Sequence, residues 1–177
     1  MTAAIRLRRL ARVDGTQLEQ LTSLLIDCVE GGASVSFMLP LTRERAGAFW
    51  QRVADGVHAG ERALLVAEDE HGIVGTVQLV LDQPENQPHR ADVAKMLVHR
   101  RARRRGLGEA LMREVEAVAR ASGKTLLVLD TVSGGDAERL YRRLGWQRAG
   151  EILDYALFPH GALCATTYYF RRVDDKA

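Results

Sequence analysis

The sequence predicts an α/β (α+β) domain built on a mixed β-sheet. Segments with the alternating, β-branched pattern of strands are interleaved with segments whose apolar residues recur every three to four positions, as in helices. Residues 91–130 read as strand, helix, strand, which is the order of a right-handed parallel crossover. The second strand of this unit, TLLVLD at 125–130, is an almost continuous apolar run, typical of a strand buried on both faces. The pattern therefore favours a sheet with helices on both of its faces.

The N-terminal half is expected to hold one strand, two helices and a β-meander. Helical spacing of leucines begins at Leu18 and ends at the Gly31-Gly32 pair, and Thr42 is placed to cap a second helix that runs to about Gly60. The turn sequence DEHG and the proline-containing QPENQP separate the segments that follow. The expected strands are residues 5–10, 63–68, 73–81 and 91–98.

The C-terminal half is expected to hold two helices and three strands. Leu107, Leu111, Val115 and Val118 form the apolar stripe of a helix that Gly123 ends. On its outer face, two i,i+4 pairs are expected to be ionic: Glu109 with Arg113, and Glu116 with Arg120. A short helix over residues 137–144 is closed by Gly145, and the expected strands are residues 125–130, 147–153 and 163–173.

The composition is that of a soluble globular protein with little excess charge. The chain has 177 residues, 46% of them hydrophobic and 27% charged, with a net charge of +2. We expect one domain over residues 1–177, because no repeat or linker interrupts the chain. The sequence lacks a secretory signal and a membrane span, so we expect a cytoplasmic protein without membrane partners. Cys28 and Cys164 lie far apart without metal-binding spacing, so we expect no metal.

A basic run followed by two glycines, VHRRARRRGLGEALM at 98–112, is the most unusual segment. Glycines at a helix start leave several main-chain N–H groups accessible, and the helix N-terminus favours anions. A pyrophosphate would fit there, although a solvated charge run explains the arginines equally well. Gly106-Leu107-Gly108 lacks the third glycine of a dinucleotide fingerprint, and SGKT at 122–125 lacks the first glycine of a P-loop. The small net charge argues against a nucleic-acid partner.

Two motifs identify a family resemblance. RRRGLG at 103–108 resembles the Arg/Gln-x-x-Gly-x-Gly/Ala signature of the GCN5-related N-acetyltransferases (GNAT), and AERLYRRLGW at 137–146 resembles their second motif. Gly134 stands where that second motif often has Asn. The resemblance implies the GNAT fold, with about seven strands, and acetyl-CoA as co-substrate in a gap where strands 91–98 and 125–130 splay apart. It assigns cofactor binding to Met96, Leu97, Val98, Arg103, Arg104, Arg105, Gly106, Leu107, Gly108 and Glu109.

A narrower resemblance is to members of that family that confer tabtoxin resistance by acetylating an amino-acid toxin that contains a β-lactam. It rests on the segments GGASVSFM at 31–38, RADVAKMLV at 90–98, LDT at 129–131 and TYYF at 167–170. We therefore expect an N-acetyltransferase that acts, by direct attack in a ternary complex, on the amine of a small molecule.

Acetylation of an amine requires a base for the ammonium proton and an acid for the departing thiolate. An alkylamine with a pKa of ~10.4 is mostly protonated at neutral pH, and a carboxylate would attract it and accept its proton. Asp130 and Asp92 are the candidates, and strand alternation is expected to put Asp92, Ala94 and Met96 on one face. A strand-end anchor and an exposed strand residue are their structural alternatives. Tyr141 lies in an apolar stripe, but the resemblance makes it the general acid.

Loops are expected to decide the acceptor. Five residues could contact it, and for each a structural role in its loop is the alternative: Ser34, Ser36, Phe37, Asp154 and Tyr155. A protein N-terminus or a lysine is the alternative acceptor, and a basic nucleic-acid binder is the alternative from another class. The sequence leaves open whether the protein is a monomer or a homodimer.

Overall fold

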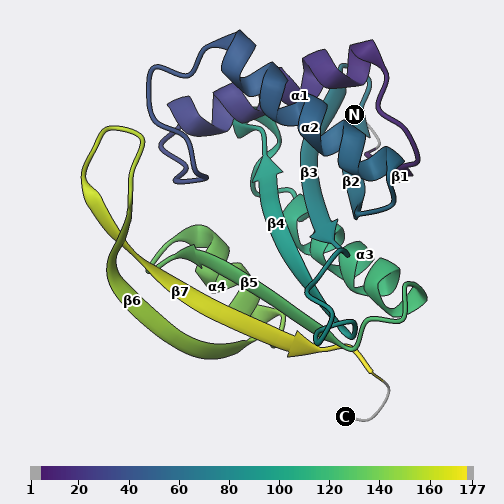
Figure 1. Ribbon diagram of the computed structural model, residues 1–177. Helices are drawn as coiled ribbons and strands as arrows, with labels where there is room; N and C mark the ends of the chain where they lie inside the picture. The colour runs from purple at the N-terminus through teal and green to yellow at the C-terminus, as the bar shows by residue number, and fades with distance from the viewer. Residues whose placement is uncertain (1–4, 175–177) are drawn as a thin grey trace.

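The computed structural model describes residues 5–174 and contains a seven-stranded sheet in the order β1-β2-β3-β4-β5-β7-β6 (Figure 1). Neighbouring strands are antiparallel except β4 and β5, which are parallel. The predicted mixed sheet is confirmed. Its strands are β1 (Arg6–Leu10), β2 (Arg62–Asp69), β3 (Gly72–Val80), β4 (Arg90–Val98), β5 (Leu126–Val132), β6 (Gln147–Leu157) and β7 (Leu163–Arg172). The helices are α1 (Gly15–Glu30), α2 (Arg43–His58), the 3₁₀ turn η1 (Arg100–Ala102), α3 (Leu107–Ala121) and α4 (Asp136–Arg143).

Local signals in the sequence account for the helix boundaries. The Asp14 side chain accepts a hydrogen bond from the Gln17 amide at 2.8 Å and starts α1. Thr42 caps α2, as predicted, by accepting from the Arg45 amide at 3.2 Å. Gly123 follows α3 with a φ of 71°, a left-handed conformation that glycine adopts without strain. The helices therefore begin and end close to their predicted positions.

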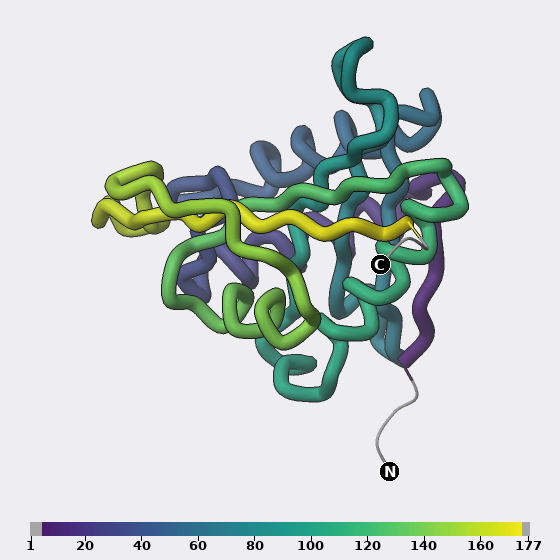
Figure 2. Tube along the Cα trace, turned by 90° about the horizontal axis from the view of Figure 1, so that it is seen from below, coloured from purple at the N-terminus to yellow at the C-terminus, as the bar shows by residue number. Residues whose placement is uncertain are grey.

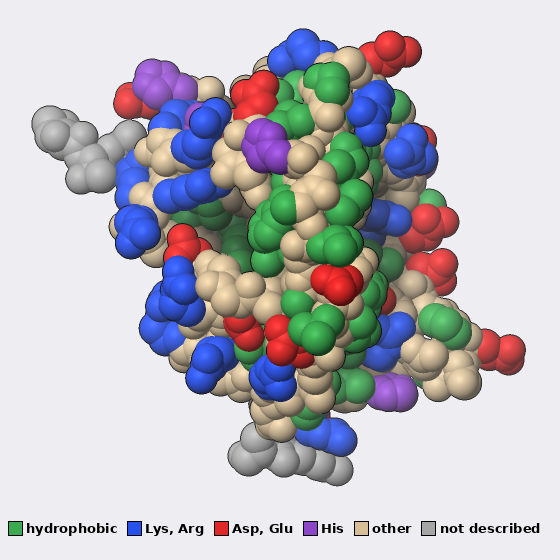
Figure 3. Space-filling model, turned by 90° about the vertical axis from the view of Figure 1, so that its left-hand side faces the viewer, with side chains coloured by type: hydrophobic (Ala, Val, Ile, Leu, Met, Phe, Trp, Pro, Cys, Tyr) green, Lys and Arg blue, Asp and Glu red, His purple; other side chains and the backbone are tan. Residues whose placement is uncertain are grey.

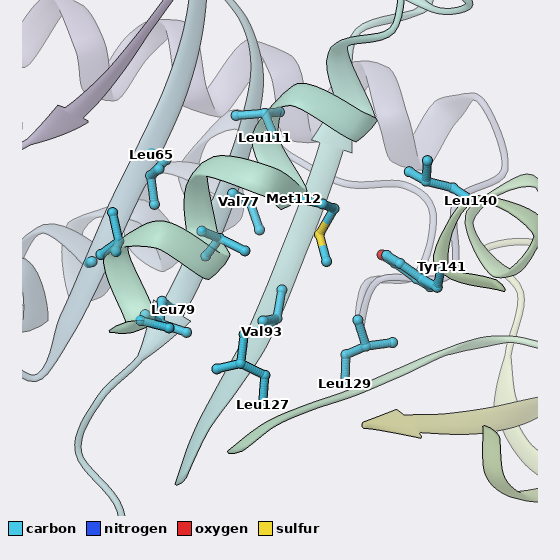
Figure 4. Packing of buried hydrophobic residues seen from close by; sticks show 14 of the residues in the cluster. Leu65, Val77, Leu79, Val93, Leu111, Met112, Leu127, Leu129, Leu140 and Tyr141 are labelled. Atoms are coloured by element: carbon cyan, nitrogen blue, oxygen red, sulfur yellow. The ribbon is translucent and has the colours of Figure 1, made fainter. Parts of the chain in front are cut away.

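The sheet has a hydrophobic core on each face. Helices α1 and α2 cover one face, where Trp50, Leu21 and Leu24 are fully buried. Helix α3 covers the other face with Leu111 and Met112, which pack toward β2, β3 and β4 (Figure 4). Seen from below, α2 and α4 lie on opposite sides of β7 (Figure 2). The prediction of helices on both faces is confirmed.

Two sequence expectations about burial are wrong. In β5, Leu127 and Leu129 are buried but Asp130 is exposed, so the strand is not buried on both faces. Its pairing with β4 ends at Val128, so the edge of its C-terminal part that faces β4 is unpaired. Glu116 is also buried, and it pairs with Arg171 at 3.0 Å instead of Arg120, because its side of α3 faces the end of β7. The other pair, between Glu109 and Arg113, is confirmed at 2.8 Å.

A bulge in β4 changes which face its side chains occupy. The register with β3 shifts between Thr76 and Gln78, opposite Lys95, whose φ is 50°. Before the bulge, Ala91 and Val93 pack into the core beneath α3. After it, Met96 packs on that same core, whereas Leu97 packs beneath α1 and α2. The expectation that Asp92, Ala94 and Met96 share one face is therefore wrong, because the bulge interrupts the alternation.

Among the helices of residues 5–174, none is long and apolar enough to span a membrane. The same residues contain no group of three or more His, Cys, Asp or Glu side chains arranged to hold a metal ion.

Candidate active site

The candidate site begins where β4 and β5 separate. The two strands pair only at Arg90 with Leu126, Ala91 with Leu127 and Asp92 with Val128. Beyond Asp92, β4 remains paired with β3 while β5 pairs with β7, and the two strands diverge in Figure 1. The predicted splaying is thus confirmed. The main chain of β4 after Asp92 is left without a partner on the β5 side within the described residues.

The segment between β4 and α3 presents main-chain groups at a helix start. Arg104 and Gly106 are both left-handed, with φ values of 58° and 77°. In the described part of the chain, no side chain caps the N-terminus of α3. The first amides of an α-helix have no partner inside the helix and carry a partial positive charge. Together with the exposed side chains of Arg103 and Arg104, they form a surface suited to a phosphate group.

A buried carboxylate fixes the start of this segment. Asp27 of α1 is 9% exposed and accepts hydrogen bonds from the amide and the Nε of Arg100, at 2.9 and 2.8 Å. Burial alone would raise the pKa of Asp27, but the two bonds from Arg100 and the nearby His99 bring it below its ordinary value. Asp27 therefore stays charged at neutral pH and holds η1 against α1.

Close packing explains why a glycine occupies position 108. A Cβ added at Gly108 would lie 2.9 Å from Leu140 Cδ2 on α4 and 3.8 Å from Met96 Sδ on β4. The start of α3, the end of β4 and α4 therefore lie close together at position 108. The main-chain groups of Met96 to Val98 and the first turn of α3 consequently border the same opening.

The opening is visible on the surface. Viewed toward the side where β4 and β5 diverge, the molecule has a hollow with hydrophobic side chains on its floor, and Lys and Arg side chains gather beside it (Figure 3). An apolar slot flanked by cations suits a long ligand whose one end is anionic.

Tyr141 projects from α4 toward this opening. Its side chain is 5% exposed and packs against Trp146 and Tyr169, with ring centroids 6.0 and 6.4 Å away. Figure 4 shows its hydroxyl directed away from α4 and toward Met112 and β4. Burial and the negative charge of Asp130 raise the pKa of Tyr141 far above its ordinary value. The hydroxyl is therefore protonated at neutral pH and available as a donor.

The neighbouring ring of Tyr169 is fixed from the other side. Its hydroxyl donates to Glu138 at 2.7 Å, and Glu138 also accepts from the main-chain N–H of Gly134. These two bonds lower the pKa of Glu138, with the main-chain bond as the larger cause. Gly134 replaces the asparagine that the family motif often has, and its main chain supplies the contact to Glu138.

The two candidate carboxylates differ in their surroundings. Asp130 is exposed and accepts one hydrogen bond, from the Thr166 hydroxyl at 3.1 Å. Asp92 lies at the last paired position of β4, where it is bound by Arg90 and by Gln83 Nε2. Asp92 is therefore already neutralised by a cation, whereas Asp130 forms no ion pair with any described residue.

The loop between α1 and α2 and the β6–β7 hairpin meet across the opening. Ser34 donates to the Leu157 carbonyl at 2.8 Å, and the Leu39 amide donates to the Pro159 carbonyl at 3.1 Å. Ser34 thus has a structural role in joining the two segments. Phe37 packs edge-on against Phe49 with a centroid separation of 5.3 Å.

Of the other residues expected to contact an acceptor, Ser36 is bonded to Lys95 and Tyr155 to Tyr168. Ser36 accepts a hydrogen bond from Lys95 Nζ at 3.1 Å. The Tyr155 hydroxyl lies 2.9 Å from that of Tyr168, which is the residue paired with Asp130 across β5 and β7. Asp154 is exposed in an irregular part of β6, with a φ of 53°.

Lys95 and Tyr168 are functional candidates that the sequence interpretation missed. Lys95 occurs within the segment 90–98 that carries the narrower resemblance, but only the bulge shows that it leaves the regular alternation. Tyr168 is adjacent to Tyr169, and only strand pairing shows that Tyr168 shares a face with Asp130. The tyrosine pair and the desolvation of Tyr168, with the charges of Asp130 and Asp92, raise the pKa of Tyr168 to about 12.

Comparison with known proteins shows the affiliation of the chain. Residues 60–148 match the model of the acetyltransferase (GNAT) domain. An N-acetyltransferase from Azospirillum brasilense, named for the hisH-hisA intergenic region, is 31% identical over 128 residues, which cover 71% of this chain and 74% of that protein. Human N-acetyltransferase 8B is 36% identical over 88 residues, or 49% of this chain. This match spans 39% of the human protein.

Solved structures share the fold over almost the whole chain. An N-acetyltransferase from Staphylococcus aureus Mu50 superposes with a TM-score of 0.80 at 15% identity and covers 97% of this chain and 100% of that one. The Salmonella typhimurium protein YncA, solved with its cofactor acetyl-CoA, superposes with a TM-score of 0.78 at 19% identity. The superposition covers 98% of this chain and 96% of YncA. A candidate phosphinothricin N-acetyltransferase superposes with a TM-score of 0.79 at 18% identity. The superposition covers 97% of this chain and 100% of that one.

Proposed function

Because the chain belongs to the acetyltransferase (GNAT) family, we propose that it transfers the acetyl group of acetyl-CoA to the amine of a small molecule. The observation that carries the proposal is the opening between β4 and β5, which has an uncapped helix start at one end and the Tyr141 hydroxyl directed toward it. The curated relatives named N-acetyltransferases and the structure solved with acetyl-CoA agree with this reaction.

The residues around the opening suit acetyl-CoA. The diphosphate would be held by the first amides of α3 and by the guanidinium groups of Arg103 to Arg105. The pantetheine arm would bond main-chain groups of Met96, Leu97 and Val98 on the β5 side of β4, where β4 has no strand partner. When bound, acetyl-CoA supplies the acetyl group as a reactive thioester. Binding then depends on main-chain geometry more than on the identity of the side chains.

Tyr141 is our candidate for the general acid. Its hydroxyl keeps its proton because burial and Asp130 raise its pKa. Among the described residues it has no hydrogen-bond partner that would hold the proton elsewhere. A buried phenol of this kind gives up its proton only when a strong acceptor, such as a thiolate, forms beside it.

Asp130 is our candidate for the general base, in preference to Asp92. Its carboxylate is exposed and engaged only by the Thr166 hydroxyl, so it can attract an ammonium group and accept its proton. Asp92 is bound by Arg90 and Gln83, and releasing it would break both contacts. Its role in the proposal is to hold the closed end of the β4–β5 pair.

A small amine that resembles an amino acid is the acceptor we favour. The narrower resemblance to the tabtoxin resistance protein supports a β-lactam or another amino-acid-like antimetabolite, and a structural neighbour is a candidate phosphinothricin N-acetyltransferase. Ser34 and Leu39 of the α1–α2 loop donate hydrogen bonds to the β6–β7 hairpin. These bonds restrict the space for an acceptor between the loop and the hairpin. A bonded loop of this kind suits a small molecule better than a protein chain.

Release of the CoA thiol tests the proposed function. The purified protein is incubated with acetyl-CoA and a panel of amino acids, polyamines, aminoglycosides, tabtoxin-like β-lactams and peptides with free N-termini. We expect turnover with a small amine and a rise in melting temperature with acetyl-CoA alone. If only the peptides are acetylated, the acceptor is a protein N-terminus and not a small molecule. If acetyl-CoA does not raise the melting temperature, and DNA or RNA raises it in a salt-sensitive way, the proposal that the protein is an acetyltransferase is contradicted.

A further inference from the structure

Lys95 carries an ammonium group that forms no ion pair with a described residue, at the acceptor side of the opening. It lies in the β4 bulge, beyond the last residue that β4 pairs with β5. Its Nζ donates to Ser36 Oγ at 3.1 Å and lies 5.8 Å from the centroid of the Phe49 ring. Within residues 5–174 it forms no ion pair. Burial lowers the pKa of Lys95, and Asp130 only partly opposes this effect.

The bulge directs this side chain to the acceptor side. A lysine with a φ of 50° is in the left-handed region, which costs a non-glycine residue about 1 kcal/mol or more. The partners of Lys95 are Ser36 in the α1–α2 loop and Phe49 in α2, which both belong to the helical layer on one face of the sheet. The ammonium therefore lies away from the α3 core and beside the loop that covers the acceptor.

Opposite charges flank the acceptor side. Asp130 on β5 is paired directly with Tyr168 on β7, and its charge acts on Lys95 and on Tyr141. Tyr168 shares the face of Asp130 through direct strand pairing, and its hydroxyl meets that of Tyr155. The site thus offers a carboxylate, an ammonium and two hydroxyls, supplied by strands β4 to β7.

We infer that Lys95 binds a carboxylate of the acceptor, so that the substrate is an amino-acid-like zwitterion whose amine is placed at Asp130. The inference rests on the proposed function and specifies its substrate class. A half-buried ammonium with one neutral hydrogen-bond partner is incompletely compensated, and an anionic group of the ligand would supply the missing charge. Polyamines and aminoglycosides lack such a group and would bring further cations next to Lys95.

Matched acceptors test this inference. For the best amino-acid acceptor, kcat/KM is compared with that of its carboxamide and of the amine without the carboxyl group. The structure predicts a preference for the amino acid of about 10- to 100-fold, the range for losing a hydrogen bond to a charged group. Equal rates for all three compounds would overturn the role of Lys95 and leave the acetyltransferase function standing.

Three variants assign the preference to the ammonium. Lys95→Met keeps the aliphatic stem and removes the charge, so the ratio between amino acid and carboxamide should fall close to one. Lys95→Arg should keep most of the ratio, because the charge remains. Ser36→Ala removes the hydrogen bond to Lys95 and not its charge, so the ratio should stay within about threefold of the wild type. A purely structural role of Lys95 would lower the rates of both compounds alike in Lys95→Met and leave their ratio as it was.

A binding measurement separates failure of the inference from failure of the proposed function. Calorimetric titration with the panel amino acids and their carboxamides needs no turnover. If no compound is acetylated, the proposed function is contradicted. Binding of an amino acid that Lys95→Met weakens at least tenfold would still support the inference, and absence of any such binding would overturn it.

Discussion

The two sides of the β4–β5 opening are supplied by the chain in different ways. On the α3 side, one continuous stretch from Met96 to Glu109 provides strand end, turn and helix start. On the side of α1 and α2, single side chains converge from separate elements: Lys95 from β4, Asp130 from β5, and Tyr155 with Tyr168 from β6 and β7. A contiguous site made of main chain suits a cofactor, and a dispersed site made of side chains can change its specificity residue by residue.

Tyr141 projects toward the opening that both sides border, so its removal is expected to have the largest effect. Tyr141→Phe should lower kcat by about 100- to 1,000-fold, because the proton donor is lost while the ring remains. The melting temperature should change by less than 3 °C, since no described residue depends on the hydroxyl for a hydrogen bond. Steady-state kinetics at saturating acetyl-CoA and a thermal melt measure both. A kcat within threefold of the wild type would exclude Tyr141 as the general acid.

Replacement of Asp130, the carboxylate proposed as the general base, is expected to have the next largest effect on activity. Asp130→Asn should lower kcat/KM for the acceptor by about 100-fold, because the amide neither attracts an ammonium nor accepts its proton. Asp92→Asn, the matched control, should lower it by less than about tenfold and should reduce stability instead, since it disrupts the contact with Arg90. The opposite order of the two variants would make Asp92 the base.

A substitution in the turn before α3 should affect the binding of acetyl-CoA and not that of the acceptor. Gly106→Ala places a Cβ at a φ of 77°, which costs about 1–2 kcal/mol and should shift the loop. We expect KM for acetyl-CoA to rise about tenfold, with little change in KM for the acceptor. Gly15→Ala is the control, because a Cβ there meets nothing within 4 Å and its φ is not left-handed. An equal rise in both KM values would mean that the two sides are not separable.

Asp27 binds Arg100 at the start of the segment that leads to α3, and its replacement should have the smallest effect on activity. Asp27→Asn should lower the free energy of unfolding by about 2 kcal/mol at pH 7, because the bonds to Arg100 weaken. The folded-state pKa of Asp27 is below its ordinary value, so the stabilisation is complete above the unfolded pKa and is lost as pH falls through the folded one. The stability difference between wild type and variant should therefore shrink below about pH 4. Urea unfolding at pH 7, 5 and 3 measures it, and a constant difference would exclude the ion pair as its cause.

The same contrast explains how much the sequence could predict. The strands, the helices and the residues from Met96 to Glu109 follow from local patterns and from one contiguous motif. The position of Lys95 could not be predicted in this way, because a bulge is a feature of strand pairing and no local signal marks it. The burial of Glu116 and the engagement of Asp92 by Arg90 likewise depend on partners that only the fold brings near. Sequence spacing therefore identifies the contiguous α3 side of the opening, whereas the dispersed side depends on contacts that only the fold creates.

Amide hydrogen exchange with and without acetyl-CoA tests whether the main chain of β4 and the start of α3 bind the cofactor, because it follows the main chain itself. We expect slower exchange on binding for residues 96–98 and 104–109, with little change at residues 34–37 and 153–155 until an acceptor is added. Protection absent from residues 104–109, or concentrated in the α1–α2 loop when acetyl-CoA is added alone, would contradict it.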